Sequence, residues 1–312
     1  MPYIRQSLPQ CSDDIFLTDG GIETSLIYQA GLDLPHFAAF DLMKTDAGCE
    51  ALRNYYRPYL DIAVRQKTGF ILESPTWRAS TDWGARLGYS SSQLADANRR
   101  AIEMMCALRE EYRSQAACIV VSGCVGPRGD GYIAGDRMSP DDAAAYHAAQ
   151  VTAFRDAGAD MVTGITMTSS DEALGLARTA SRLGLPAVIS FTVETDGSLP
   201  SGEPLGQAIE KVDRGTEIAP AYYMINCAHP EHFALSLAEQ QQWTGRIRGV
   251  RANASRKSHA ELDECTSLDD GDPAELAALY GKLRSALPHL TVLGGCCGTD
   301  HRHIAAISQV FA

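Results

Sequence analysis

The sequence LTVLGGCCGT at residues 290–299 joins a short apolar run to two adjacent cysteines that lie between glycines. A short apolar run that ends in glycine is typical of a buried strand followed by a turn of the backbone. Cys296 and Cys297 therefore fall at a predicted strand end. We interpret this segment as the centre of a site rather than as part of the packed core.

Three interpretations of the adjacent thiols compete. A disulfide between them is disfavoured, because neighbouring Cα atoms lie ~3.80 Å apart and unstrained bridges need roughly 4.4 Å or more. Buried thiols that pack as small apolar side chains are the ordinary alternative. A shared metal ion requires the chain to leave strand geometry, because successive strand residues point to opposite faces. Gly295 and Gly298 permit this departure, since glycine tolerates positive φ.

Cys227 is the candidate for a third metal ligand. It lies in YYMINCAHP at residues 222–230, again between a strand-like run and a turn. Three thiolates leave one position of a tetrahedral zinc ion open, which is the arrangement of a catalytic zinc site. A histidine from the same regions could fill that position and make the site structural. We instead place the four candidates in the first turns of the following helices: His229, His232, His301 and His303.

Apolar, β-branched-rich runs recur along the whole chain between amphipathic helical patterns. Eight such runs are present, which is the strand count of a (β/α)8 (TIM) barrel, and 312 residues suit such a barrel as a single domain. No linker or repeat divides the chain, so we predict one domain over residues 1–312. The predicted strands are 15–18, 69–73, 118–122, 161–164, 187–191, 222–226, 247–251 and 290–293.

Helix start signals occur between several of these runs. Ser139 and Asp272 are each followed by proline, which predicts an N-cap with proline at the first helical position. Ser169 and Glu172 have the spacing of a capping box. These helices are predicted to form the outer ring of the barrel.

The net charge of the chain limits the kinds of ligand that it is expected to bind. The formal net charge of −12 disfavours nucleic acid or an anionic membrane as a partner and favours a small-molecule substrate. The N-terminus has no apolar signal core, so we expect a cytoplasmic protein. Its nine cysteines should then be mostly reduced. We assign four of them to packing: Cys49, Cys106, Cys118 and Cys124.

Other polar residues follow the predicted strands, at the end where a barrel builds its active site. Asp19, Gly20 and Gly21 follow the first strand, and the glycines allow a ligand to approach the backbone. Glu73 ends the second strand; a pocket-facing carboxylate and one tied to a neighbouring amide are both open interpretations. The polar segment 255–272 follows the seventh strand and is either a lid over the site or a solvated excursion.

Together these motifs resemble the homocysteine S-methyltransferase family. The carriers are Asp19-Gly20-Gly21, Val125-Gly126-Pro127, Asn226-Cys227, Gly294–Thr299 and His303-Ile304, which are spread over nearly the whole chain in the family's order. The resemblance implies a (β/α)8 barrel with Cys227, Cys296 and Cys297 as zinc ligands. It further implies methyl transfer from a sulfonium donor, S-methylmethionine or S-adenosylmethionine, to a thiol acceptor, homocysteine, giving methionine. Asp19 would then orient the acceptor, and Asn253 would line the pocket from the seventh strand.

One departure from the family pattern concerns the acceptor. The family usually carries an acid after the fourth strand, where it is expected to hold the amino group of homocysteine, whereas this chain has Ile165. We expect either that Glu23, close behind Asp19-Gly20-Gly21, compensates, or that the acceptor is another small thiol. Two further alternatives remain: a demethylase of sulfonium donors that uses any available thiol, and a non-enzymatic zinc-binding redox sensor. The sequence leaves the donor, the exact acceptor and the oligomeric state open.

Overall fold

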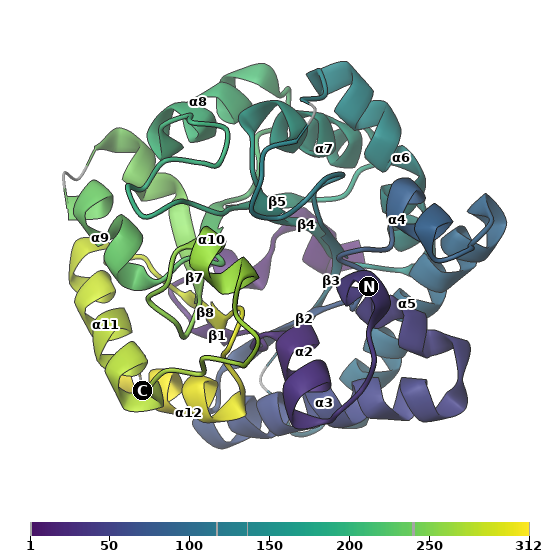
Figure 1. The fold of residues 1–312 in the computed structure, drawn as a ribbon, viewed down its shortest axis with the longest axis horizontal. Coiled ribbons are helices and arrows are strands. Elements are labelled where there is room, and N and C mark those ends of the chain that lie inside the picture. The colour runs from purple at the N-terminus through teal and green to yellow at the C-terminus, as the bar shows by residue number, and fades with distance from the viewer. Residues whose placement is uncertain (1, 117, 136, 239–240, 312) are drawn as a thin grey trace.

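The computed structural model describes residues 2–116, 118–135, 137–238 and 241–311 and confirms the predicted (β/α)8 barrel. Neighbouring strands pair in parallel in the order β1 to β8, and β8 pairs with β1 to close the barrel. Figure 1 shows the helices as a ring around the strands, with α12 near the C-terminus lying against α3 from the N-terminal part. None of the helices in the described segments is both long and apolar enough to cross a membrane.

All eight predicted strands are present; β2 and β5 have the predicted bounds, and the others have shifted ends. β1 is only two residues long, β4 runs three residues further than predicted, and β8 begins two residues later. The strands are β1 (Phe16–Leu17), β2 (Gly69–Glu73), β3 (Ile119–Val125), β4 (Met161–Met167), β5 (Ala187–Phe191), β6 (Tyr223–Asn226), β7 (Ile247–Ala252) and β8 (Val292–Gly295).

The helices that cover the barrel connect successive strands, and shorter helical turns precede or interrupt them. The α-helices are α1 (Pro2–Gln6), α2 (Ile22–Thr24), α3 (Asp46–Gln66), α4 (Thr81–Arg86), α5 (Ser91–Tyr112), α6 (Pro140–Ala157), α7 (Ser170–Arg182), α8 (Leu205–Gly215), α9 (Pro230–Ala238), α10 (His259–Asp263), α11 (Pro273–Ala286) and α12 (His301–Phe311). A π-helical turn, η2 (Ser25–Gln29), continues α2, and the 3-10 turns are η1 (Pro9–Cys11), η3 (Pro35–Phe37), η4 (Ala39–Lys44) and η5 (Gln242–Arg246).

The helix start signals are confirmed at all three positions, because α6, α7 and α11 begin directly after Ser139, Ser169 and Asp272, and two of these side chains form the capping hydrogen bonds. The Ser139 hydroxyl accepts from the Asp142 amide, and the Asp272 carboxylate accepts from the amides of Ala274 and Glu275. The capping box predicted for Ser169 is wrong, because its side chain makes no capping hydrogen bond. Glu172 instead bonds the His147 ring at 3.0 Å and the Arg128 amide at 2.7 Å.

Two apolar clusters pack against the strands, one outside the barrel and one inside it. A large cluster fills the space between strands and helices, and a smaller one fills the barrel interior with side chains such as Ile71, Val120 and Val188. The N-terminal arm packs against the interior cluster through Leu8, and Gln10 donates to the Tyr222 hydroxyl at 3.3 Å. The interior is therefore filled with side chains, and the loops after the strands are left to form the site.

Candidate metal centre and substrate cavity

The three predicted metal ligands meet at the C-terminal face of the barrel. Cys227 follows β6, Cys296 and Cys297 follow β8, and their Sγ atoms all lie within 4.8 Å of one another. The Sγ atoms of Cys227 and Cys297 are 3.5 Å apart. Zinc–sulfur bonds of ~2.3 Å in a tetrahedron separate sulfur atoms by about 3.8 Å. The donor set and its spacing therefore fit a zinc ion.

The backbone around β7 fixes these cysteines. The Cys227 amide donates to the Arg251 carbonyl at 3.1 Å, and the Cys296 amide donates to the Ala252 carbonyl at 2.9 Å. Cys227 has a φ of 56°, an uncommon left-handed conformation for a residue with a side chain. This conformation breaks the strand alternation directly after β6.

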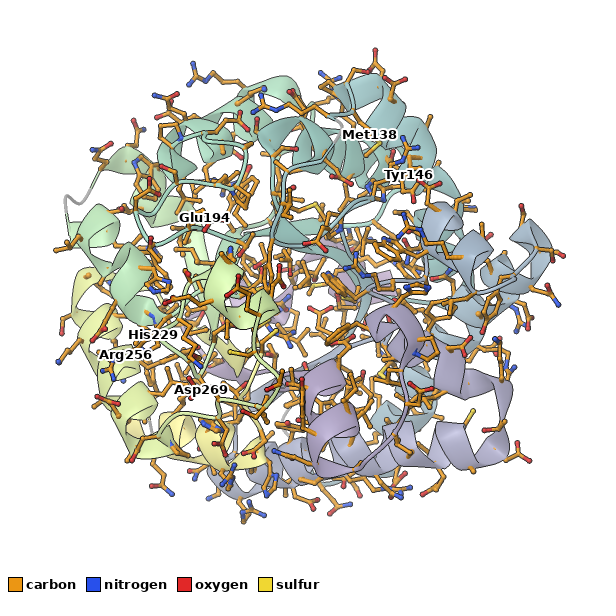
Figure 2. All side chains as sticks on the ribbon, in the orientation of Figure 1. Met138, Tyr146, Glu194, His229, Arg256 and Asp269 are labelled. Atoms are coloured by element: carbon orange, nitrogen blue, oxygen red, sulfur yellow. The ribbon has the colours of Figure 1, made fainter. Side chains whose placement is uncertain are left out.

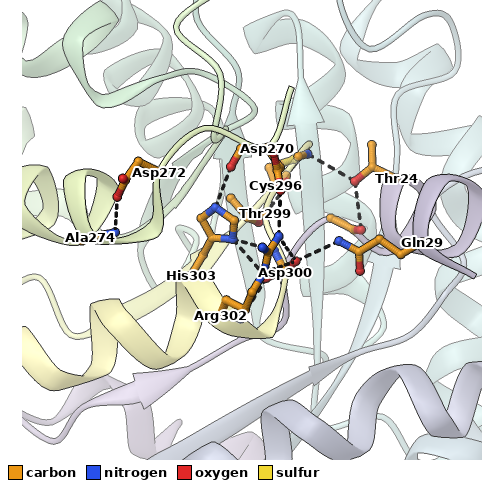
Figure 3. Close-up of polar contacts among 12 residues, drawn as sticks. Thr24, Gln29, Asp270, Asp272, Ala274, Cys296, Thr299, Asp300, Arg302 and His303 are labelled. Atoms are coloured by element: carbon orange, nitrogen blue, oxygen red, sulfur yellow. Dashed lines mark hydrogen bonds and ion pairs between the residues drawn. The ribbon is translucent and has the colours of Figure 1, made fainter. Parts of the chain in front are cut away.

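The turn after Cys297 is held by hydrogen bonds that involve Thr24 and Thr299 (Figure 3). Gly298 has a φ of 80°, and its amide donates to the Thr24 hydroxyl at 3.2 Å. The Thr299 hydroxyl donates to the Cys296 carbonyl at 2.7 Å. Gly295 has no positive φ; it is needed for close packing, since a Cβ there would lie 2.0 Å from the Thr299 hydroxyl oxygen. The chain thus leaves strand geometry directly after Gly295, and Gly298 supplies the positive φ of the turn that follows.

The histidines near the cysteines have structural partners. The buried His303 ring contacts the Asp300 carboxylate at 3.2 Å and the Asp270 carbonyl at 2.8 Å (Figure 3). His229 precedes α9 and is buried, and burial lowers its pKa to about 4. Among the residues described, the group of side chains close enough to share an ion contains three cysteines and no histidine.

The three thiols titrate as one unit. Hydrogen bonds from Cys227 and Cys297 lower the pKa of Cys296 well below its usual value, and the Arg251 cation adds to this effect. Donation to that thiolate raises the pKa of Cys227. The cluster therefore holds one negative charge readily, and a bound cation is needed to stabilise the further thiolates.

A buried ion pair braces the floor of the site. Arg251 donates from Nη2 to Asp19 Oδ1 at 2.8 Å and from Nε to the Gly295 carbonyl at 3.1 Å. The Tyr55 hydroxyl donates to Asp19 Oδ2 at 3.0 Å. Arg251 also reaches the Gly20 carbonyl at 3.3 Å, so one side chain ties together the ends of β1, β7 and β8. The charge of Asp19 is consequently matched within the protein.

The three cysteines open onto a cavity of about 240 Å³. Most of the substrate residues predicted from the sequence line it: Asp19, Gly20, Gly21, Glu23 and Glu73. Asn253 is not among the lining residues; it is buried after β7, where its backbone N–H donates to the Ala228 carbonyl at 3.1 Å. The cavity size suits small molecules, in keeping with the ligand class expected from the charge.

Two glutamates that line this cavity, Glu23 and Glu73, have raised pKa values. Glu23 is half-buried, and burial raises its pKa to about 8, with the negative charge of Cys296 adding to the effect. Burial raises the pKa of Glu73 to about 7, against the opposing Arg251 cation. Neither carboxylate oxygen of Glu73 has a hydrogen-bond partner among the residues described. Of the two interpretations of Glu73, the structure favours the carboxylate that faces the pocket.

Glu73 should make stability depend on pH. Its pKa is raised from 4.5 to about 7, so the folded state holds this proton more tightly than the unfolded chain. That contribution is lost as pH rises from 4.5 to 7, and ionisation above pH 7 costs up to about 3 kcal/mol. We compare the free energy of unfolding of Glu73→Gln with that of the parent. The difference should shift in favour of the variant by about 3 kcal/mol between pH 5 and pH 8. Urea titrations of both proteins at the two pH values measure it; a pH-independent difference would contradict the assignment.

Tyr132, in the segment between β3 and α6, is a site residue that no sequence motif indicated. Its hydroxyl lies 3.5 Å from Cys227 Sγ and 3.4 Å from Cys297 Sγ. Its ring stacks on His259 of α10 at 4.2 Å, and His259 Nε2 lies 2.8 Å from the Cys227 carbonyl oxygen. Two loops that are distant in sequence therefore meet over the cysteine cluster.

Segment 255–272 lies over the cavity near the cysteine cluster, and polar contacts hold it against the rest of the barrel. Ser255 donates to Asp269 at 2.7 Å, Arg256 pairs with Glu231 at 3.0 Å, and His259 contacts Glu194 at 3.0 Å. Arg256 and Asp269 lie before and after α10 within this segment, and Glu194 comes from the loop after β5 (Figure 2). Several of its residues line the cavity, so the segment belongs to the site in this conformation. That it opens and closes as a lid stays a prediction.

Ile165, the apolar residue where the family usually carries an acid, lies near the end of β4. Ile165 is buried and lines the cavity, and its carbonyl accepts from Trp77 Nε1 at 3.2 Å. The next residue, Thr166, has a φ of 62°, and its amide donates to Asn226 Oδ1 at 2.9 Å. Asn226 Nδ2 in turn lies 3.8 Å from Cys296 Sγ. Asn226 thus links the β4 end to the cysteine cluster.

Fold and site together define a (β/α)8-barrel protein with a three-cysteine centre at the mouth of the barrel. Comparison with known proteins refines this class. A sequence model of the homocysteine S-methyltransferase family matches residues 16–311. Homocysteine S-methyltransferase from Escherichia coli K12 is 26% identical, over 94% of each chain. Homocysteine S-methyltransferase 1 from Arabidopsis thaliana is 21% identical, over 94% of this chain and 92% of its own.

A solved structure agrees with the fold. The metallated form of the homocysteine methyltransferase MmuM from Escherichia coli superposes with a TM-score of 0.75 and 22% sequence identity, covering 95% of this chain and 96% of that one. The chain belongs to the homocysteine S-methyltransferase family, and it is a methyltransferase.

Proposed function

We propose that this protein holds zinc through Cys227, Cys296 and Cys297 and transfers a methyl group from a sulfonium donor to homocysteine, giving methionine. The observation that carries the proposal is the cysteine cluster. Three thiols from two strand ends open onto a small-molecule cavity, and no fourth ligand side chain joins them among the residues described. An open ligand position is what distinguishes a catalytic zinc site from a structural one.

Zinc bound by these thiolates would supply Lewis acidity that favours the thiolate form of an acceptor thiol near neutral pH. The surrounding residues hold the ligands in place. Asn226 is fixed by Thr166 at 2.8 Å and by Ser190 at 2.6 Å while its amide points toward Cys296 Sγ. The Tyr132 hydroxyl contacts two of the three sulfur atoms. Proximity of donor and acceptor within one enclosed cavity contributes the rest of the rate.

Glu23 is our candidate for binding the acceptor's ammonium group. Ile165 offers no charge, and Asp19 is already paired with Arg251, whereas the Glu23 side chain lines the cavity with a pKa raised by burial. An approaching ammonium would favour its ionised form. Glu23→Gln is expected to raise KM for homocysteine about tenfold or more, because a hydrogen bond to a charged group is worth roughly 1.5–3 kcal/mol. Unchanged homocysteine affinity in calorimetry would remove Glu23 from this role.

The donor we propose is S-methylmethionine or S-adenosylmethionine. Two acidic side chains line the cavity, Glu23 and Glu73, and burial raises the pKa of both; an approaching sulfonium cation would favour their ionised forms and be attracted to them. The demethylase alternative uses the same cavity with a different thiol, and the apolar Ile165 is the observation that favours it.

The experiment is a methyl-transfer assay on zinc-loaded protein with each donor against a panel of thiols. The proposal predicts transfer to homocysteine at the highest kcat/KM. Comparable rates with unrelated thiols would favour the demethylase. A zinc-binding protein that transfers no methyl group to any thiol would favour the redox-sensor alternative and contradict the proposal.

A further inference from the structure

Arg78, in the segment after β2, carries a buried cation at the cavity that the proposed function leaves without a role. It is 6% exposed and lines the cavity. Its guanidinium lies 4.0 Å from the Trp77 ring centroid and 3.8 Å from the Trp83 ring centroid. Contacts of this kind stabilise a cation and fix the plane of an arginine head group. The side chain is therefore held in place before any ligand arrives.

The hydrogen-bonding capacity of Arg78 is mostly unused. Nη1 donates to the Gly129 carbonyl at 2.7 Å. Nη2 lies 3.8 Å from the half-exposed Asp130 carboxylate, beyond hydrogen-bond distance, and Nε has no partner among the residues described. Burial lowers the pKa of Arg78 to about 10, which is the sign of an incompletely compensated cation. Buried charges without full pairing are costly, so they commonly await a ligand.

The surroundings of Arg78 indicate which ligand. Its neighbour Trp77 bonds to the Ile165 carbonyl, so the arginine segment adjoins the position where the family's acid is missing. Glu23 is near enough for the two charges to affect each other's pKa, yet no ion pair joins them. The cavity thus presents a cation and an anion, separated from each other, beside the cysteine cluster.

We propose that Arg78 binds the carboxylate of a substrate amino acid. A guanidinium recognises carboxylates through paired, charge-assisted hydrogen bonds. This inference rests on the proposed function and names the chemistry of its ligand: a thiol or sulfonium amino acid whose carboxylate meets Arg78. The carboxylate comes either from the acceptor or from the donor, because both are amino acids.

The test is calorimetric binding to zinc-loaded protein with two matched ligand pairs. The acceptor pair is homocysteine and 3-aminopropane-1-thiol, which lacks only the carboxylate. The donor pair is S-methylmethionine and (3-aminopropyl)dimethylsulfonium, which differ in the same way. The parent protein should bind the carboxylate member of one pair roughly tenfold or more tightly than its partner. The pair that shows this preference identifies the source of the carboxylate.

Arg78→Gln should abolish that preference while leaving the affinity for the ligand without a carboxylate unchanged. Arg78→Lys should restore part of it, because lysine keeps the charge but not the planar head group. Arg86→Gln is the matched control, since Arg86 contacts the same Trp83 ring, at 4.3 Å, from an exposed position. Circular dichroism and zinc content verify the fold of each variant, and Arg78→Lys decides the question if Arg78→Gln does not fold.

Three results would overturn the inference: no carboxylate preference in either pair, a preference that survives in Arg78→Gln, or an equal loss of affinity for both members of a pair. These outcomes are independent of turnover. A protein that binds carboxylate ligands through Arg78 but transfers no methyl group would refute the proposed function alone. A protein that methylates homocysteine with no role for Arg78 would refute this inference alone.

Discussion

Cys296→Ser and Cys227→Ser are each expected to lose stoichiometric zinc and methyl transfer together. Each substitution removes one of three thiolates whose sulfur atoms lie within 4.8 Å of one another. Loss of a residue that merely orients a metal ligand lowers metal affinity roughly 10–100-fold, and loss of the ligand itself should cost more. Metal analysis after dialysis against a weak chelator measures the effect. Activity should fall in proportion to the zinc that is lost.

Cys118→Ser is the control for removing a thiol elsewhere in the barrel. Cys118 packs against the interior cluster and is not in the group of candidate ligands. This variant should keep one zinc per chain and full activity. Retention of one zinc per chain by both Cys296→Ser and Cys227→Ser would contradict the assignment of the metal centre.

Arg251→Met should be the most destabilising single substitution in the floor of the site. It leaves the buried Asp19 carboxylate without its cation, 2.8 Å away in the parent, and releases the carbonyls of Gly20 and Gly295. Breaking a buried ion pair on one side typically costs about 3–5 kcal/mol. Urea unfolding of the zinc-free protein measures the change without the contribution of metal binding.

The double variant Asp19→Asn with Arg251→Met separates charge from packing. With both charges removed, no buried ion is left unpaired, so part of the lost stability should return. A coupling free energy near zero in this cycle would show that the two side chains act independently. The brace described for the floor of the site would then be wrong.

The fold was predictable because each strand, and several of the helices, carries a local signal. Eight apolar runs separated by amphipathic segments matched eight strands, and Ser139 and Asp272 marked helix starts correctly. Ser169 also precedes a helix, but its capping box does not form, because the partners of Glu172 come from elsewhere: His147 and the amide of Arg128. Local spacing cannot reveal a competing partner that is close only in the folded chain.

The difference between local patterns and contacts formed only on folding also decides which site residues could be predicted. Cys296 and Cys297 were found because adjacent thiols at a strand end are a local pattern, and Cys227 repeats that context. The pairing of Arg251 with Asp19 spans 232 residues, and the contact of Tyr132 with Cys297 spans 165. Arg78 becomes notable only when its burial between two rings and its unused donors are visible.

X-ray absorption at the zinc edge tests the central claim most directly, because it counts the sulfur atoms about 2.3 Å from the ion. The account predicts three sulfur neighbours in the zinc-loaded protein and four after homocysteine is added. Four sulfur neighbours before any thiol is added, or three that persist at saturating homocysteine, would contradict it.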